Sequence, residues 1–63
     1  MRNAQKLRKL YKKTQDEMAD VIGYSKPLYV AFERGKMDLP EQQIEILCAY
    51  FHVTKEYLLS EEE

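Results

Sequence analysis

The sequence predicts an all-α fold, a compact domain of five short helices. Apolar residues recur every three or four positions through most of the chain, which is the repeat of a helix with one buried face. Signals for helix starts stand at Thr14, Ser25 and Pro40. No segment shows the polar–apolar alternation or the Asn-Gly turn of a β-hairpin. We therefore expect residues 1–63 to form a single domain, with residues 61–63 as a disordered acidic tail.

The first predicted helix runs from about Asn3 to Tyr11. Ala4 and Leu7 lie on one face of it, and Leu10 or Tyr11 extends that face by a further turn. We expect this face to be buried. Lysine and arginine residues cover the opposite face, which is either an ordinary solvated surface or a surface that meets a polyanion.

The second predicted helix begins at Thr14, because Glu17 follows three residues later. In this capping box, the threonine hydroxyl and the glutamate carboxylate each accept a hydrogen bond from a backbone N–H that the helix leaves unpaired. The expected buried stripe consists of Met18, Ala19 and Ile22. Gly23 should end the helix, because glycine readily adopts the left-handed conformation that follows a helix.

The third predicted helix has Ser25 as its N-cap. Pro27 is tolerated in its first turn, where the missing N–H has no partner within the helix. We expect Tyr29 and Phe32 to point inward and Gly35 to end the helix. Glu33, in the last turn, is expected to be structural and to pair with a cationic side chain of the first or second helix.

The last two predicted helices start near Pro40 and at Thr54. Proline is common in the first turn of a helix, and threonine is a good N-cap. The expected buried residues of the fourth helix are Ile44, Leu47, Cys48 and Phe51. In the fifth helix we expect Tyr57 and Leu58 to face the core, with Val53 packing just before it.

Charge is segregated along the chain, although the formal net charge is only −1. Residues 1–36 contain nine lysines and arginines and four acidic residues, which gives +5. Residues 37–63 contain one lysine and seven acidic residues, which gives −6. This asymmetry creates a cationic half that suits contact with phosphates and an acidic half that is held away from them.

The sequence offers little material for catalysis or metal binding. Cys48 and His52 are the only residues of their types, so neither an internal disulfide nor a zinc-ligand set can form. No nucleophile–base pair or phosphate-binding loop is present. We therefore expect a protein that is not an enzyme and binds no cofactor or metal. No apolar run approaches the ~20 residues of a membrane span, and the N-terminal residues do not resemble a signal peptide, which predicts a cytoplasmic protein.

The segment from Thr14 to Gly35 has the layout of a helix-turn-helix, two short helices joined by a three-residue turn that contains glycine. Its sequence, TQDEMADVIGYSKPLYVAFERGK, resembles the motif of the Cro/lambda-repressor-like (XRE-type) helix-turn-helix family. The later segment IEILCAYFHVTKEYLL is similar to the closing helices of the same family. The resemblance extends from about Asn3 to Leu59.

This resemblance implies a lambda-repressor-like fold and a transcriptional regulator, most simply a repressor, that binds double-stranded DNA as a homodimer with its third helix in the major groove. By position in the family motif, the phosphate-contacting residues are Thr14, Gln15, Arg34 and Lys36. The base-facing residues are Lys26, Pro27, Val30 and Ala31. The candidate dimer contacts are Tyr50, Val53 and Leu59.

The base-facing residues depart from the family pattern, in which polar side chains usually read base edges through hydrogen bonds. Val30 and Ala31 are apolar and suit contact with thymine methyl groups, while Lys26 is placed to reach a guanine or a phosphate. Lys12 and His52 stand at helix ends where the family often has glycine.

A second interpretation is a helix-turn-helix that binds a protein, such as an antirepressor or a heterodimer partner with weak DNA readout. The apolar outer face of the third helix and the acidic second half of the chain both suit it, because exposed apolar patches often mark partner sites.

Overall fold

The computed structural model describes residues 1–61 and confirms the all-α fold within them. Its five helices are α1 (Asn3–Leu10), α2 (Gln15–Ile22), α3 (Lys26–Glu33), α4 (Glu41–Phe51) and α5 (Lys55–Leu59). Apart from helices, one isolated antiparallel bridge joins Arg2 to Glu61. None of the helices in this part of the chain has the length and apolar character that crossing a membrane requires.

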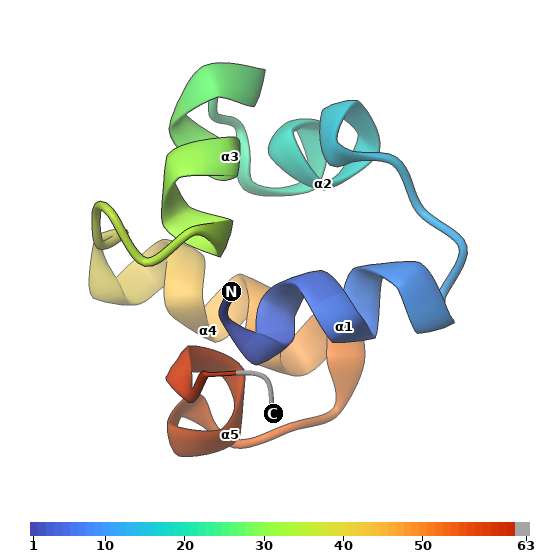
Figure 1. Cartoon of the computed structure of the whole chain (residues 1–63), viewed down its shortest axis with the longest axis vertical. Coiled ribbons are helices and arrows are strands. Elements are labelled where there is room, and N and C mark those ends of the chain that lie inside the picture. Colours follow the sequence, from blue (N-terminus) through green and yellow to red (C-terminus); the bar gives the residue numbers. More distant parts are fainter. Residues whose placement is uncertain (62–63) are drawn as a thin grey trace.

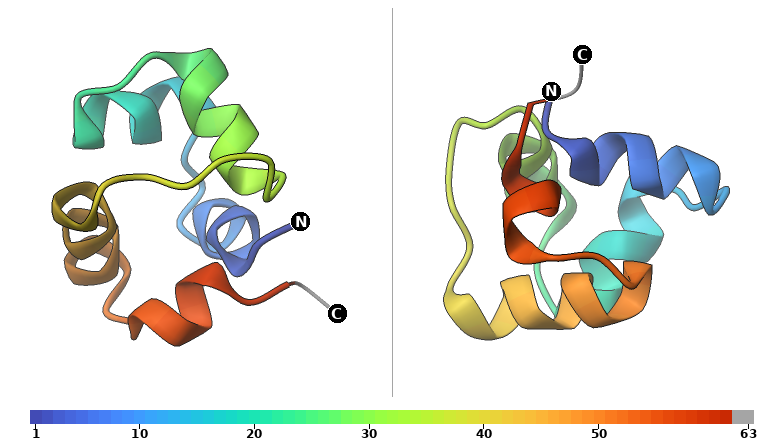
Figure 2. Two further views of the ribbon diagram at one scale, coloured as in Figure 1. Left: turned by 90° about the vertical axis from the view of Figure 1, so that its left-hand side faces the viewer. Right: turned by 90° about the horizontal axis from the view of Figure 1, so that it is seen from below.

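The helices form a nearly isometric body whose extents are 25 × 24 × 22 Å. Figure 1 shows α2 and α3 at one end and α5 at the other, with α1 and α4 between them. The turned view on the left of Figure 2 keeps the same order. The helix-turn-helix unit is therefore supported from one side by the rest of the molecule, and the opposite side of α3 remains open.

The core draws on all five helices and on the segment between α3 and α4. Its buried apolar side chains are Ala4, Leu7, Met18, Ala19, Ile22, Tyr29, Phe32, Leu39, Ile44, Leu47, Phe51 and Leu58. Most of these positions were predicted from their three- and four-residue spacing. Leu39 lies outside any helix, so periodicity gave no reason to expect its burial.

The helix ends of the helix-turn-helix follow the predicted chemistry. Thr14 Oγ1 accepts a hydrogen bond from Glu17 N at 3.1 Å, and Glu17 Oε1 accepts one from Thr14 N at 2.9 Å, which completes the capping box. Gly23 follows α2 with φ +73° in the left-handed region. Ser25 occupies the N-cap position of α3, but its side chain makes no capping hydrogen bond.

Two predictions of inward-facing side chains were wrong: that of Leu10 or Tyr11 in the first helix and that of Tyr57 in the fifth. Leu10 and Tyr11 are 67% and 41% exposed, because α1 ends at Leu10 and the chain then turns through Lys12, whose φ is +57°. Tyr57 is 40% exposed, because its neighbour Leu58 occupies the inward position of α5 and successive helical side chains point about 100° apart.

Two further expectations need correction or restriction. Cys48 is only half-buried, because it lies beside the buried stripe of α4 and packs against the edge of the core. Glu61, expected in a disordered tail, forms the bridge with Arg2, and its carboxylate lies 3.1 Å from the N-terminal amine. The other two residues of that predicted tail lie outside the described residues.

Candidate nucleic-acid interface

Glu33 connects α3, which carries most of the candidate interface, to α1 and α2. Its side chain is completely buried, and Oε2 accepts a hydrogen bond from Arg8 Nε of α1 at 2.6 Å. Oε1 accepts further hydrogen bonds from Arg8 Nη2 at 3.3 Å and from Gln15 Nε2 of α2 at 3.2 Å. The predicted pairing of Glu33 with a cation of the first or second helix is confirmed, and it fixes α3 against both.

The start of α2 presents Thr14 and Gln15, the residues that family position assigns to phosphates. Thr14 is exposed and Gln15 is half-buried, because one amide hydrogen of Gln15 is donated to Glu33. The carbonyl oxygen and the second amide hydrogen of Gln15 remain for other partners. The Glu17 carboxylate accepts a hydrogen bond from Thr14 N, and this bond holds the pKa of Glu17 below its ordinary value.

The inward side of α3 is strongly apolar around Tyr29. The Tyr29 side chain is fully buried, and among residues 1–61 its hydroxyl has no hydrogen-bond partner. Burial raises the pKa of this phenol well above its ordinary value, and the negative charge of Glu33 raises it further. The hydroxyl is therefore protonated, and it is turned away from the surface of α3 that a ligand could reach.

The outward side of α3 carries the four predicted base-facing residues. Lys26 and Pro27 are exposed, and Val30 and Ala31 are half-buried. Leu28, which the family motif did not single out, is 43% exposed beside them. Lys26 Nζ lies 3.8 Å from Asp16 Oδ2, a distance at the limit of an ion pair between two exposed side chains.

Arg34 and Lys36 follow α3 and are both exposed. Gly35 between them has φ +75°, a backbone conformation that lets the chain reverse direction directly after the helix. Neither cation takes part in an ion pair among the described residues. Their side chains therefore remain available to an anionic ligand.

Arg2 has a role that sequence reasoning missed. Its Nη2 lies 2.6 Å from Asp38 Oδ1, its Nη1 donates to Met37 O at 3.2 Å, and its guanidinium lies 4.7 Å from the centre of the Phe32 ring. These contacts hold the segment that follows α3 against the N-terminus. No local pattern could have identified them, because Asp38 is 36 residues away along the chain.

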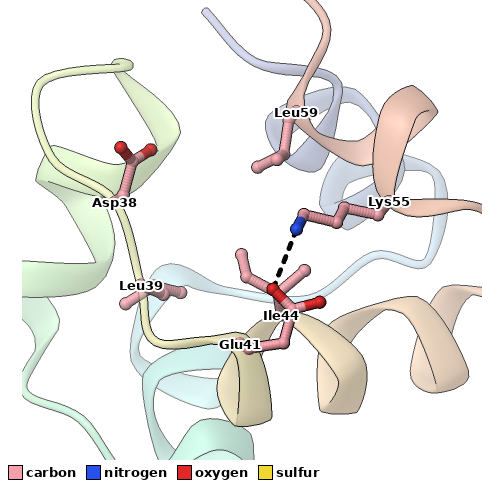
Figure 3. A pocket seen from close by; sticks show the side chains of 6 residues that line it. All are labelled: Asp38, Leu39, Glu41, Ile44, Lys55 and Leu59. Atoms are coloured by element: carbon pink, nitrogen blue, oxygen red, sulfur yellow. Dashed lines mark hydrogen bonds and ion pairs between the residues drawn. The ribbon is translucent and has the colours of Figure 1, made fainter.

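The candidate dimer residues lie on the side of α4 and α5. The Tyr50 ring is 6.0 Å from that of Tyr11 and 5.2 Å from that of Phe51. Val53 and Leu59 are both half-buried. Figure 3 shows Leu59 above a small pocket that is crossed by the hydrogen bond from Lys55 Nζ to Glu41 Oε2, at 2.8 Å.

The pocket does not involve the candidate DNA contacts. Its lining residues are Asp38, Leu39, Glu41, Ile44, Lys55 and Leu59. Among residues 1–61, no group of three or more histidine, cysteine, aspartate or glutamate side chains is arranged to hold a metal ion. The feature with the clearest functional geometry in the described chain is therefore the surface formed by α3 and the start of α2.

Comparison with known proteins agrees with this geometry. A family model described as helix-turn-helix matches residues 5–58, from the first turn of α1 to the inward-facing Leu58 of α5. Among curated proteins, no sequence matches this chain.

Proposed function

The chain belongs to the Cro/lambda-repressor-like helix-turn-helix family of DNA-binding regulators, and on this premise we propose that it represses transcription by occupying an operator. In this proposal residues 1–63 act as one DNA-binding domain that places α3 in the major groove. The protein acts by binding alone, at the nucleoid in the cytoplasm, and carries out no reaction of its own.

The observation that carries the proposal is the open surface of α3 with unpaired cations directly after it. Lys26 stands at the first position of the helix, and Arg34 and Lys36 follow its last turn. Contacts of such cations with phosphates would set the position of the helix on the duplex, while Val30 and Ala31 would lie near base edges.

The start of α2 supplies a second set of phosphate contacts in this proposal. The unpaired backbone N–H groups and the positive end of a helix dipole favour an anion at a helix N-terminus. Thr14 and Gln15 stand at this end of α2, and the Gln15 amide is oriented by Glu33. The buried Arg8–Glu33 pair would therefore hold the two sets of phosphate contacts in a fixed relation.

We further propose that the protein binds as a homodimer. One recognition helix reads only a few base pairs, and a two-fold axis doubles the contact with a palindromic site. The candidate contacts are Tyr50, Val53 and Leu59, on the side of α4 and α5. In this arrangement the acidic second half of the chain lies away from the duplex.

Selection of duplexes from a random pool tests the proposal. We expect enrichment of an A/T-containing palindrome. Ala31→Asp should nearly abolish binding, because it brings a carboxylate toward the phosphates. Lys26→Ala should cost about 1–3 kcal/mol and relax the preference at one base pair if Lys26 contacts a guanine.

The opposite outcome is equally specific. Two results together would show that α3 binds a protein and that the repressor proposal is wrong. The random pool would give no enriched sequence, and the wild-type protein would capture a partner from a DNA-free extract of the native cell that Val30→Glu no longer captures. Glu56→Ala, which changes an exposed residue of α5, serves as the control that should leave either interaction intact.

A further inference from the structure

The outward surface of α3 has no hydrogen-bonding side chain between Lys26 and Arg34. The polar groups of this segment, the Tyr29 hydroxyl and the Glu33 carboxylate, are both buried. The side chains that reach solvent in this segment are Pro27, Leu28, Val30 and Ala31. Ala31 is three or four residues from Pro27 and Leu28, and helix geometry places such residues side by side. They therefore form one continuous apolar surface.

Cations bracket this apolar surface. Lys26 precedes it, and Arg34 and Lys36 follow it. At a rise of 1.5 Å per residue, Lys26 and Arg34 are separated along the helix axis by roughly 12 Å, so the cations stand at the two ends of the apolar surface. A ligand that matches this pattern has anionic edges and an apolar group between them. Resting on the proposed function, we take this ligand to be duplex DNA.

The apolar group that a major groove offers is the methyl at C5 of thymine. Cytosine presents a hydrogen at that position, and 5-methylcytosine presents the same methyl. An apolar side chain distinguishes the methyl from the hydrogen by contact, but it has no donor or acceptor with which to distinguish thymine O4 from the cytosine amino group. We propose that α3 reads C5-methyl groups of pyrimidines as such, so that 5-methylcytosine substitutes for thymine and cytosine methylation strengthens binding.

The test measures the affinity of the wild-type protein for four duplexes based on the sequence enriched from the random pool. The first duplex keeps the preferred thymines, and the second carries deoxyuridine in their place. The third and fourth carry cytosine and 5-methylcytosine there, with guanine opposite. Deoxyuridine keeps the hydrogen-bonding groups of thymine and removes only the methyl. We expect about a fourfold loss of affinity per contacted methyl removed, the effect of withdrawing one methyl-sized group from an apolar contact. 5-Methylcytosine should bind more tightly than cytosine by a similar factor.

Two variants assign the effect to α3. Val30→Ala and Leu28→Ala should each reduce the ratio of thymine to deoxyuridine affinity, and because Leu28 is exposed its variant should fold normally. Arg34→Ala is the matched control, which should weaken binding to all four duplexes equally. Equal affinity for the thymine and deoxyuridine forms would overturn this inference alone. Absence of binding to any duplex would overturn the proposed function and this inference with it.

Discussion

At the scale of single residues, Glu33 has the largest structural consequence. It is completely buried, and it receives hydrogen bonds from Arg8 on α1 and from Gln15 on α2. Its sequence position alone indicated a structural pairing, because a carboxylate in the last turn of α3 can meet a cation of a helix that packs against it, and α1 carries Lys6, Arg8 and Lys9. The choice of Arg8 could not be predicted, since the first half of the chain contains nine lysines and arginines and their orientations depend on the tertiary fold.

Glu33→Gln is expected to lower the free energy of unfolding by about 3 kcal/mol, because it leaves the Arg8 charge buried without its counter-charge. Chemical denaturation measures the change. Glu41→Gln is the matched control, since it breaks an ion pair of similar length, 2.8 Å, between two exposed side chains. That variant should lose at most about 1 kcal/mol. A Glu33→Gln protein of unchanged stability but altered DNA preference would show that Glu33 acts in recognition.

Tyr29→Phe is expected to raise the free energy of unfolding by about 1 kcal/mol at neutral pH, because it removes a buried hydroxyl that has no partner among the described residues. Burial raises the phenol's pKa above its ordinary value of 10.0, so the unfolded chain releases this proton first. The titration of Tyr29 therefore leaves the free energy of unfolding of the wild type unchanged below about pH 10 and lowers it as the pH rises further. The stability difference between the variant and the wild type should therefore widen above pH 10. A variant less stable than wild type at neutral pH would contradict this.

At the scale of helices, agreement between sequence and structure depends on how local the determining contacts are. The start of α2 was predictable because Thr14 and Glu17 are three residues apart and need no tertiary contact. The family resemblance placed Lys12 at a helix end, and Lys12 does take the left-handed conformation there, but the exposure of Tyr11 just before it was not predicted. Tyr11 then leaves the predicted buried stripe, and its hydroxyl donates to Phe51 O at 3.2 Å. That contact joins the residue after α1 to the last residue of α4, which lies 40 residues away along the chain, so local spacing could not predict it.

Thr14→Ala is expected to reduce the free energy of unfolding by about 1 kcal/mol, because it removes the side-chain half of the capping box. Ser25→Ala is the control: Ser25 has the same N-cap position on α3, but its side chain makes no capping hydrogen bond, so its loss should be smaller. Thermal unfolding of both variants measures the difference.

The lowered pKa of Glu17 adds stability that is present above its ordinary value of 4.5 and is lost as the pH falls below it. Thr14→Ala should weaken this acid dependence, and equal losses in the two variants would refute the assignment.

At the scale of the whole molecule, the fold determines which part of the cationic half of the chain belongs to the candidate interface. The sequence already showed that residues 1–36 carry a net positive charge, but α2 and α3 themselves contain one cation, Lys26, beside four acidic residues, and Arg34 and Lys36 directly follow α3. The fold adds that these two helices lie at one end of the molecule, with α5 at the other (Figure 1). The sequence could not show that Arg2 is engaged with Asp38 and Phe32, because those partners come together only through tertiary contacts.

The candidate site was predictable to different depths. Family position supplied the residues of α3 and the start of α2, and the structure leaves Lys26, Pro27, Arg34 and Lys36 exposed. Leu28 was not among the base-facing residues assigned by family position, and its contribution depends on how far α3 is rotated toward solvent. The hydrogen bond from the Gln15 amide to Glu33 could not be predicted from residue spacing either, since it requires the packing of α2 against α3.

The most direct measurement of the central claim is the affinity of the protein for duplex DNA across a series of salt concentrations. Phosphate contacts release counterions, so the logarithm of affinity should fall linearly with the logarithm of salt, with a slope of several units. The double variant Arg34→Ala and Lys36→Ala should reduce the slope by about two. Lys55→Ala, which removes a cation from α5, should leave it unchanged. Binding that is insensitive to salt, or a slope that the double variant leaves intact, would contradict the assignment of this surface to DNA.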